Sequence, residues 1–474
     1  MATGTDNKIL ASENLKSDER IQQGKQLILD AVKEHQSSLT EIRPPRPELA
    51  EKFQSLLDGF GSVRGGNLYF PYLSSGIGNG PFVELMDGSV KLDFITGIGV
   101  HGFGHSHPLL VEAGIDAAIS DTVMQGNLQQ GGESYELVKL LTTTANESGG
   151  KLEHCFLTTS GAMANENSLK IAFQKHAPAD RILAFERCFA GRTLALSQLT
   201  DKAKNRVGLP QTVDVDYLPF FDADDPKGST QRALNVMREH IRRYPGRHAI
   251  LWMELIQGEG GYYPGDPKFF RALINLAHKH NIAFIADEIQ TFGRSSRPFA
   301  FQHFQLDDIT DLVTIGKISQ VCATLYTPEY KPKPGLISQT FTGSSWAIVS
   351  SQRILKTLIE NGHYGESGRN LQLFECFKSG LQAVGKKHPG TIAGPFGCGG
   401  MVGFTPLDGS MARAKDLVFR MYHAGLMSFV AGSDPVRIRF LMPLGSVTEA
   451  HIASACDVIE KCIVESLADE KSNA

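Results

Sequence analysis

Charged side chains follow three apolar segments at the points where each is expected to end as a β-strand. Asp287 comes directly after NIAFIA, Lys317 after DLVTIG, and Glu254 after HAILWM. Continuous apolar runs that alternate with amphipathic helices indicate a parallel sheet covered on both faces. Such sheets bind ligands at the carboxyl ends of their strands. We therefore expect acids and a lysine to face one crevice there, although each residue taken singly is most often a solvated surface group.

A glycine is expected to open the helix that follows the strand-like HCFLTT. Gly161 and Ala162 would be the first residues of that helix. The free N–H groups and the dipole at a helix N-terminus suit a phosphate, and a glycine lets the backbone approach it closely. An ordinary strand-to-helix turn is the simpler alternative for these two residues.

Composition and charge narrow the class of protein. The 474 residues are 41% hydrophobic and 21% charged, as in an average soluble protein, and this length predicts two or three domains. A formal net charge of −4 without a basic block gives no support to a nucleic-acid partner, and no apolar stretch approaches a membrane span. Seven scattered cysteines without a C-x-x-C pair indicate reduced thiols. We expect a cytoplasmic protein that binds neither nucleic acid nor a membrane.

The pattern along the chain changes twice. Residues 1–15 look disordered and residues 16–34 have apolar positions at helical spacing. Residues 105–345 alternate apolar strands with longer helices, whereas strands and helices mix after residue 390. We expect an α/β protein whose large domain spans residues 105–345. The segments 1–104 and 346–474 would form a smaller α+β domain.

Five motifs, in order, make residues from about 65 to 445 resemble class III aminotransferases. The motifs are TSGAMANEN (159–167), FAGRT (189–193), ELIQGEGG (254–261), ADEIQT (286–291) and GK (316–317). The resemblance implies an aspartate-aminotransferase-like fold of type I, pyridoxal 5′-phosphate as cofactor, and a homodimer. It is nearest to the lysine 6-aminotransferase and 4-aminobutyrate aminotransferase branch, because Gln320-Val321-Cys322 after the lysine is closer to lysine 6-aminotransferases.

The resemblance assigns a role to each cofactor-binding residue. Lys317 would hold the cofactor covalently and then carry the proton, which requires a neutral amine and hence a lowered pKa. Asp287 would stabilise the protonated pyridine nitrogen, although capping or a structural ion pair is its simpler role. Phe189 and Ile289 would cover the ring faces and Gln290 would reach the ring hydroxyl. The remaining cofactor-binding positions are Gly161, Ala162, Glu254 and Thr340, the last across a dimer interface unless it is a buried structural threonine.

Two arginines are expected to select substrate carboxylates, because a planar guanidinium suits a carboxylate in two hydrogen bonds. By resemblance, Arg192 holds the distal carboxylate of the donor and Arg439 takes the α-carboxylate of glutamate or 2-oxoglutarate. Glu259 would pair with Arg439 until the dicarboxylate arrives. Ala190 departs from the family, which usually has histidine there, and a glycine is missing before Phe292.

A glycine pattern and three histidines give little support for a dinucleotide site or a metal site. Gly97-Ile98-Gly99-Val100-His101-Gly102 is a literal G-x-G-x-x-G, but HGFGHSHP follows where a dinucleotide site needs a helix to open. His101, His105 and His107 have no nearby carboxylate or cysteine to complete a metal site. We expect no metal.

The sequence thus predicts a transaminase that moves an ω-amino group from lysine or 4-aminobutyrate to 2-oxoglutarate. An acetylornithine or ornithine δ-aminotransferase is the close alternative. A non-transaminating enzyme of the same fold, such as an aminomutase or decarboxylase, and a cofactor-binding protein without turnover are the more distant ones.

Overall fold

The centre of the protein is a seven-stranded sheet in the order β5-β13-β12-β11-β8-β6-β7. The structure is a computed structural model that describes residues 10–473. Every strand of this sheet runs parallel to the others except β13, which is antiparallel to both neighbours. The strands are β5 (His154–Thr158), β6 (Arg181–Phe185), β7 (Asp214–Leu218), β8 (His248–Glu254), β11 (Ala283–Glu288), β12 (Leu312–Ile315) and β13 (Cys322–Tyr326). The expected mostly parallel sheet is confirmed.

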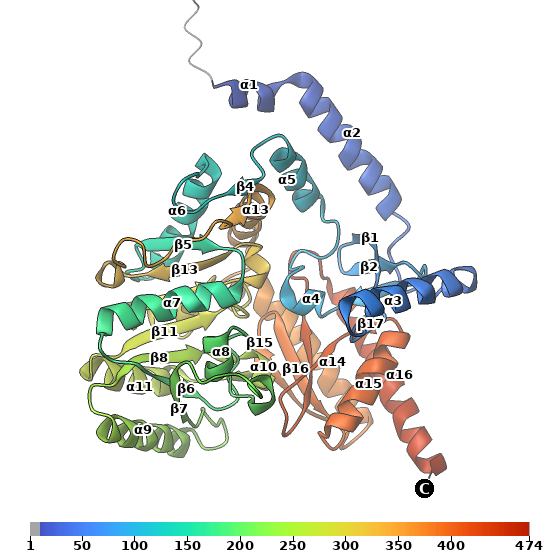
Figure 1. Ribbon diagram of the computed structural model, residues 1–474. Coiled ribbons are helices and arrows are strands. Elements are labelled where there is room, and N and C mark those ends of the chain that lie inside the picture. The colour runs from blue at the N-terminus through green and yellow to red at the C-terminus, as the bar shows by residue number, and fades with distance from the viewer. Residues whose placement is uncertain (1–9, 474) are drawn as a thin grey trace, which may run out of the picture.

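Both faces of this sheet are buried, which explains its continuous apolar strands. In β11, Ala283 and Ile285 belong to the core beneath α7 (Gly161–His176), whereas Phe284 and Ala286 belong to the core shared with α11 (Pro267–Lys279). Figure 1 shows α7 lying across the sheet. Because side chains alternate along a strand, the next residue, Asp287, faces the α7 side. The other helices packed on this sheet or its edge are α6 (Gly132–Asn146), α8 (Leu194–Leu199) and α9 (Pro226–Arg243).

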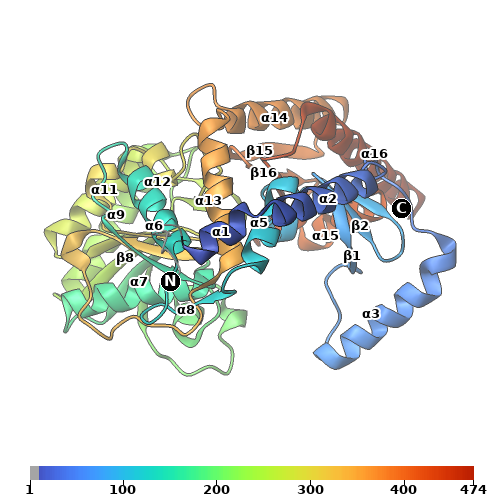
Figure 2. The ribbon, with the colours of Figure 1, turned by 90° about the horizontal axis from the view of Figure 1, so that it is seen from above.

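The N-terminal and C-terminal segments share a second body of structure. Strand β3 (Val90–Asp93) pairs with β17 (Leu426–Met427), so residues more than 300 positions apart form one sheet in the order β1-β2-β3-β17. The other sheet has the order β15-β16-β19-β18. Its strands and covering helices are β15 (Ile392–Cys398), β16 (Met401–Pro406), β18 (Phe429–Ala431), β19 (Arg437–Leu441), α14 (Arg369–Lys387), α15 (Met411–His423) and α16 (Glu449–Asn473). Figure 2 shows α13 (Ser345–Glu360) between this body and the large sheet. The boundaries at residues 104 and 345 stay predictions.

The N-terminal part corrects one expectation. Residues 11–15 are helical, because α1 (Ala11–Ser17) precedes α2 (Glu19–Gln36), so disorder is wrong for them; residues 1–9 lie outside the described part. Helix α2 packs on α5 (Pro108–Ala118). The remaining elements are α3 (Ala50–Arg64), β1 (Ser74–Asn79), β2 (Phe82–Leu85), α4 (Thr96–Gly99), β4 (Val123–Met124), β9 (Ile256–Gln257), α10 (Gly258–Gly261), β10 (Tyr263–Pro264), α12 (Ala300–His303) and β14 (Gly343–Ser344).

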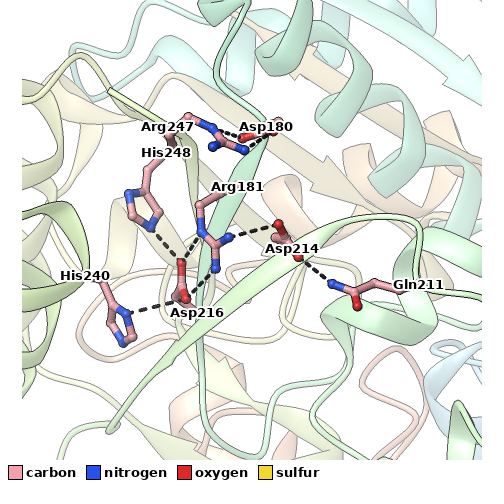
Figure 3. Close-up of polar contacts among 8 residues, drawn as sticks. All are labelled: Asp180, Arg181, Gln211, Asp214, Asp216, His240, Arg247 and His248. Carbon is pink, nitrogen blue, oxygen red and sulfur yellow. Dashed lines mark hydrogen bonds and ion pairs between the residues drawn. The ribbon is translucent and has the colours of Figure 1, made fainter. Parts of the chain in front are cut away.

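An ionic cluster ties together the amino ends of β6, β7 and β8, at the edge of the sheet opposite the lysine (Figure 3). Asp216 accepts two hydrogen bonds from Arg181, at 2.8 and 2.9 Å, and lies 2.8 Å from Nε2 of His248. Nδ1 of His240, on α9, is 3.4 Å from the same carboxylate. Although burial acts against it, the Arg181 guanidinium and the hydrogen bond from His248 hold the pKa of Asp216 below its usual value.

Candidate active site

A cavity of about 530 Å³ opens at the carboxyl edge of the large sheet, where the sequence places the chemistry. Most of the expected site residues line it. They are Gly161, Ala162, Phe189, Arg192, Glu254, Glu259, Asp287, Ile289, Gln290 and Lys317. The parallel strands β8, β11 and β12 bring Glu254, Asp287 and Lys317 together, since all three follow or end neighbouring strands.

Asp287 is held in place by amide donors. The backbone N–H of Ile289 donates to Oδ1 at 2.9 Å, and Nδ2 of Asn165 donates to Oδ2 at 2.7 Å. Burial raises the pKa of Asp287 to about 6. No arginine, lysine or histidine within residues 10–473 forms a hydrogen bond or ion pair with it. Because a buried carboxylate without a cationic partner is costly, Asp287 is suited to pair with a positively charged group of a molecule bound in the cavity.

Asn165 lies in the TSGAMANEN motif, but no role for it was expected from the sequence. Its Nδ2 also donates to the carbonyl oxygen of Ala190 at 2.8 Å, and its Oδ1 accepts from Oγ1 of Thr314 at 2.7 Å. It thereby fixes the orientation of Asp287 from α7. Its place four residues after Gly161, on the same helical face, is the signal that could have identified it.

Lys317 has the properties that a nucleophilic amine requires. It follows β12 through Gly316 and adopts a left-handed φ of 55°, a conformation that costs a non-glycine residue about 1–2 kcal/mol. Burial, followed by the nearby guanidinium of Arg439, lowers the pKa of Lys317 to about 7. This direction agrees with the expected lowering, and an amine with such a pKa is neutral to a large extent near pH 7.

The N-terminus of α7 provides a phosphate-sized recess. Among residues 10–473, no acceptor is bonded to the N–H groups of Gly161 or Ala162, whereas Ser160 caps the helix through the N–H of Met163 at 3.2 Å. A Cβ at Gly161 would lie 2.9 Å from Cγ2 of Ile289, so a larger residue here would displace the side chain that is expected to cover one ring face. Free N–H groups here, Asp287 and Lys317 fit the phosphate, ring nitrogen and aldehyde of pyridoxal phosphate.

Glu254 organises two loops around the cavity. Its Oε1 accepts from the N–H of Phe189 at 2.8 Å and its Oε2 from the N–H of Gly258 at 2.7 Å. Burial, followed by the charge of Asp287, raises the pKa of Glu254 to about 8. Since both oxygens contact the backbone, its direct contact with a cofactor stays a prediction.

Arg439 and Glu259 form the expected ion pair. Nη2 of Arg439 lies 2.5 Å from Oε1 of Glu259, and Nη1 donates to Oε1 of Gln290 at 3.4 Å. The guanidinium is fully buried. Burial alone would raise the pKa of Glu259, but Arg439 outweighs it and keeps that pKa below its usual value.

Arg192 and Thr340 occupy more exposed positions. Arg192 lies at the rim of the cavity, 5.9 Å from the ring of Phe189, and has no ion-pair partner within the described residues. Thr340 is exposed in the segment between β13 and β14 and does not line the cavity. The alternative that Thr340 is a buried structural residue is therefore wrong, whereas a contact across a dimer interface stays a prediction.

The glycine-rich segment after residue 95 forms a tight turn. Gly97 and Ile98 within α4 both have positive φ angles, and the next regular helix, α5, begins at Pro108. Nε2 of His105 lies 3.0 Å from Oδ2 of Asp93 and is thus engaged in the core. Within residues 10–473 there is no cluster of three metal-ligating side chains.

Fold and site together place a lysine and a buried carboxylate in one cavity at the carboxyl edge of an α/β sheet. A family model, Aminotransferase class-III, matches residues 71–463. The chain belongs to the class-III aminotransferases, and it is a pyridoxal-phosphate-dependent transaminase. No helix in the described part of the chain is long and apolar enough to cross a membrane.

Acetylornithine aminotransferases are among its relatives in sequence. That of Bacillus subtilis is 30% identical over 391 residues, which cover 81% of this chain and 93% of the relative. That of Caldanaerobacter subterraneus is 27% identical over 403 residues, covering 82% and 94%. These relatives support the acetylornithine alternative better than the lysine or 4-aminobutyrate expectation.

Solved structures share the fold. The lysine aminotransferase from M. tuberculosis has a TM-score of 0.77 at 23% identity and covers 86% of this chain and 99% of its own. The ornithine aminotransferase from Toxoplasma gondii has a TM-score of 0.75 at 21% identity, with 88% and 96% covered. At these identities the likeness extends to the fold alone.

Proposed function

We propose that the protein transfers the terminal amino group of an ornithine-type amino acid, free or acetylated at its α-nitrogen, to 2-oxoglutarate. The acetylornithine aminotransferases among the relatives favour this donor class. The buried pair of Arg439 and Glu259 supports a site that accepts an ω-amino donor and a dicarboxylate in turn. A donor that presents its ω-amino end places no carboxylate beside the reacting carbon, so Glu259 neutralises Arg439. A dicarboxylate places its α-carboxylate there and takes over Arg439.

The residues of this chain divide the work between binding and proton transfer. Pyridoxal phosphate, when bound, withdraws electrons from the reacting carbon of the substrate. Asp287 stabilises the positive charge of the ring nitrogen, and Asn165 keeps that carboxylate oriented. Lys317, as a neutral amine, would take a proton from the reacting carbon of the substrate and deliver it to the cofactor. Arg192, at the rim, holds the distal carboxylate of either substrate.

A donor panel tests the proposal. Purified holoenzyme is supplied with N-acetylornithine, ornithine, lysine or 4-aminobutyrate together with 2-oxoglutarate, and glutamate formation is measured. The highest kcat/KM is expected for N-acetylornithine or ornithine. A higher value for lysine or 4-aminobutyrate would favour the second candidate, whereas no glutamate from any amine would favour a non-transaminating enzyme.

We propose further that the protein is a homodimer. Exposed Thr340 precedes Phe341, whose side chain is 61% exposed, and Leu128 nearby is 89% exposed. The pairing of β4 with β14 brings these two segments close together, and contiguous exposed apolar side chains of this kind mark interaction surfaces. A cytoplasmic location is also proposed, since four of the seven cysteines are buried as free thiols.

A further inference from the structure

A second cavity, of about 570 Å³, lies beside the catalytic one. It is bounded by the loop after β7, by β10 and by the beginning of the β15–β16 hairpin, so it lies between the large sheet and the C-terminal sheet. It shares β19 with the active site, because Arg437 lines this cavity and Arg439 contacts Glu259 in the other. Side chains two positions apart on a strand point the same way, about 7 Å from each other.

Arg437 is a buried cation without an acidic partner. Its side chain is 5% exposed, and its guanidinium lies between two rings, 3.8 Å from that of Tyr263 and 3.4 Å from that of Phe396. Nη1 donates to the carbonyl oxygen of Gly261 at 2.6 Å, whereas Nε has no partner. Within residues 10–473, no carboxylate forms an ion pair with it.

Burying an arginine without a counter-charge is costly. Stacking on two rings offsets part of that cost, since each cation–π contact contributes about 0.5–2 kcal/mol, but it leaves Nε without an acceptor. A second cation, the exposed Arg187, adds to the positive charge, and its guanidinium lies 5.5 Å from the centre of the Tyr263 ring. The inner part of the cavity therefore favours an anion.

The rest of the lining specifies what accompanies the anion. Phe220, Phe221 and Pro395 provide apolar walls. The exposed acids that line the same cavity are Glu186, Asp222 and Asp224. Arg232 also lines this cavity, but its charge is balanced by Asp225 at 2.6 Å. Acids in the lining repel a simple dianion such as phosphate, but they attract a cationic group on the same molecule. A small molecule in which a short apolar chain joins a carboxylate to a positive charge would match the arginines, the apolar walls and the acids of this cavity.

We propose that this cavity binds a small zwitterionic carboxylate, of the amino-acid or guanidino-acid class, separately from the catalytic site. Its carboxylate contacts Arg437 and Arg187, its chain packs between the aromatic rings, and its cationic end faces the acids. The bound molecule bridges the two bodies of the protein next to α10, the turn that holds Glu259.

The test uses 4-guanidinobutyrate as the probe, because it has both charged ends but no primary amine to transaminate. Its binding to the full-length holoenzyme is measured by calorimetry, with pentanoate as the probe that lacks the cationic end. The measurement is repeated after amino-oxyacetate has blocked the catalytic cofactor. Millimolar or tighter binding that is stronger than that of pentanoate and survives the block is expected.

Two variants locate the site. Arg437→Leu should weaken 4-guanidinobutyrate binding about tenfold to a hundredfold, the usual effect of losing a charge-assisted contact. Arg187→Gly should weaken it severalfold, and the φ of 66° at this position favours glycine, so this variant remains informative if Arg437→Leu fails to fold. Circular dichroism and cofactor absorbance check the fold of each variant.

Any of three results would overturn the proposal. The first is the absence of millimolar binding to the wild type, which would leave Arg437 a structural residue at the junction. The second is loss of binding on blocking the cofactor, which would place the probe in the catalytic cavity. The third is affinity that does not depend on charge. This would appear as unchanged affinity of 4-guanidinobutyrate for the folded variants, or as equal affinity of the wild type for pentanoate.

Discussion

Neutralising Glu259 should separate the two halves of the transamination cycle. Glu259→Gln keeps the shape of the side chain but removes the charge that faces Arg439 at 2.5 Å. The guanidinium is fully buried and would then lack a counter-charge whenever the ω-amino donor occupies the site. The half-reaction with the donor should slow, whereas the α-carboxylate of glutamate or 2-oxoglutarate should meet an arginine without a competitor.

The size of the effect follows from the contact that is lost. A hydrogen bond between charged groups contributes about 1.5–3 kcal/mol, and 1.36 kcal/mol corresponds to a tenfold change in rate. The preference for the dicarboxylate half over the donor half should therefore change by about tenfold to a hundredfold. Loss of Glu259 should also lower the pKa of Lys317 further, since this carboxylate raises it.

Single-turnover absorbance of the cofactor measures each half separately. Glu259→Asp is the matched control, because it keeps the charge and shortens the reach by one methylene, so the donor half should be largely retained. If Glu259→Gln slows both half-reactions by the same factor, the Glu259 carboxylate does not give up Arg439 to the α-carboxylate of a substrate. The proposed exchange at Arg439 would then be refuted.

Four other predictions address the cofactor, the assembly and the fold. Borohydride reduction should attach the cofactor to Lys317, as read by peptide mapping, and a label on any other lysine would reject the assignment. Asp287→Asn should lower kcat by more than about a hundredfold, or about 2.7 kcal/mol, with an unchanged circular dichroism spectrum; a rate within tenfold of the wild type would disprove its role. Sedimentation should show a dimer that Thr340→Ala leaves intact while weakening cofactor affinity, and a fully active monomer would contradict this. Stability should fall as the pH falls below about 6.5 and again below about 3.8, because His248 and Asp216 have lowered folded-state pKa values and the unfolded chain therefore binds those protons first. Thermal denaturation of Asp216→Asn should show a lower Tm and a flatter dependence below about pH 3.8, where the Asp216 contribution is removed, and the same slope as wild type in that range would refute the cluster's part.

The local pattern of the chain was sufficient to predict the large sheet and the place of Asp287 and Lys317 at its carboxyl edge. Apolar runs ending at Asp287 and Lys317 predicted parallel strands, and neighbouring parallel strands bring their carboxyl ends to one edge whatever the rest of the fold does. In the folded sheet, the period of two along β11 places Asp287 on the face that α7 covers. Glycine at position 161 was likewise readable, since it opens the helix directly after a strand.

Contacts between distant segments were decided only by the tertiary structure. The likeness to a family suggested the pairing of Glu259 with Arg439, but the distance between them and their burial depend on how β19 packs beside α10, 180 residues away in sequence. The role of Asn165 and the exposure of Thr340 depend in the same way on neighbours that no local pattern specifies. Arg437 shows the difference most clearly. Its neighbours in sequence are equally compatible with a solvated arginine, whereas the structure places its guanidinium against two aromatic rings without a counter-charge. Burial and the nearest charges set the behaviour of an ionisable group, and both arise only when the chain has folded.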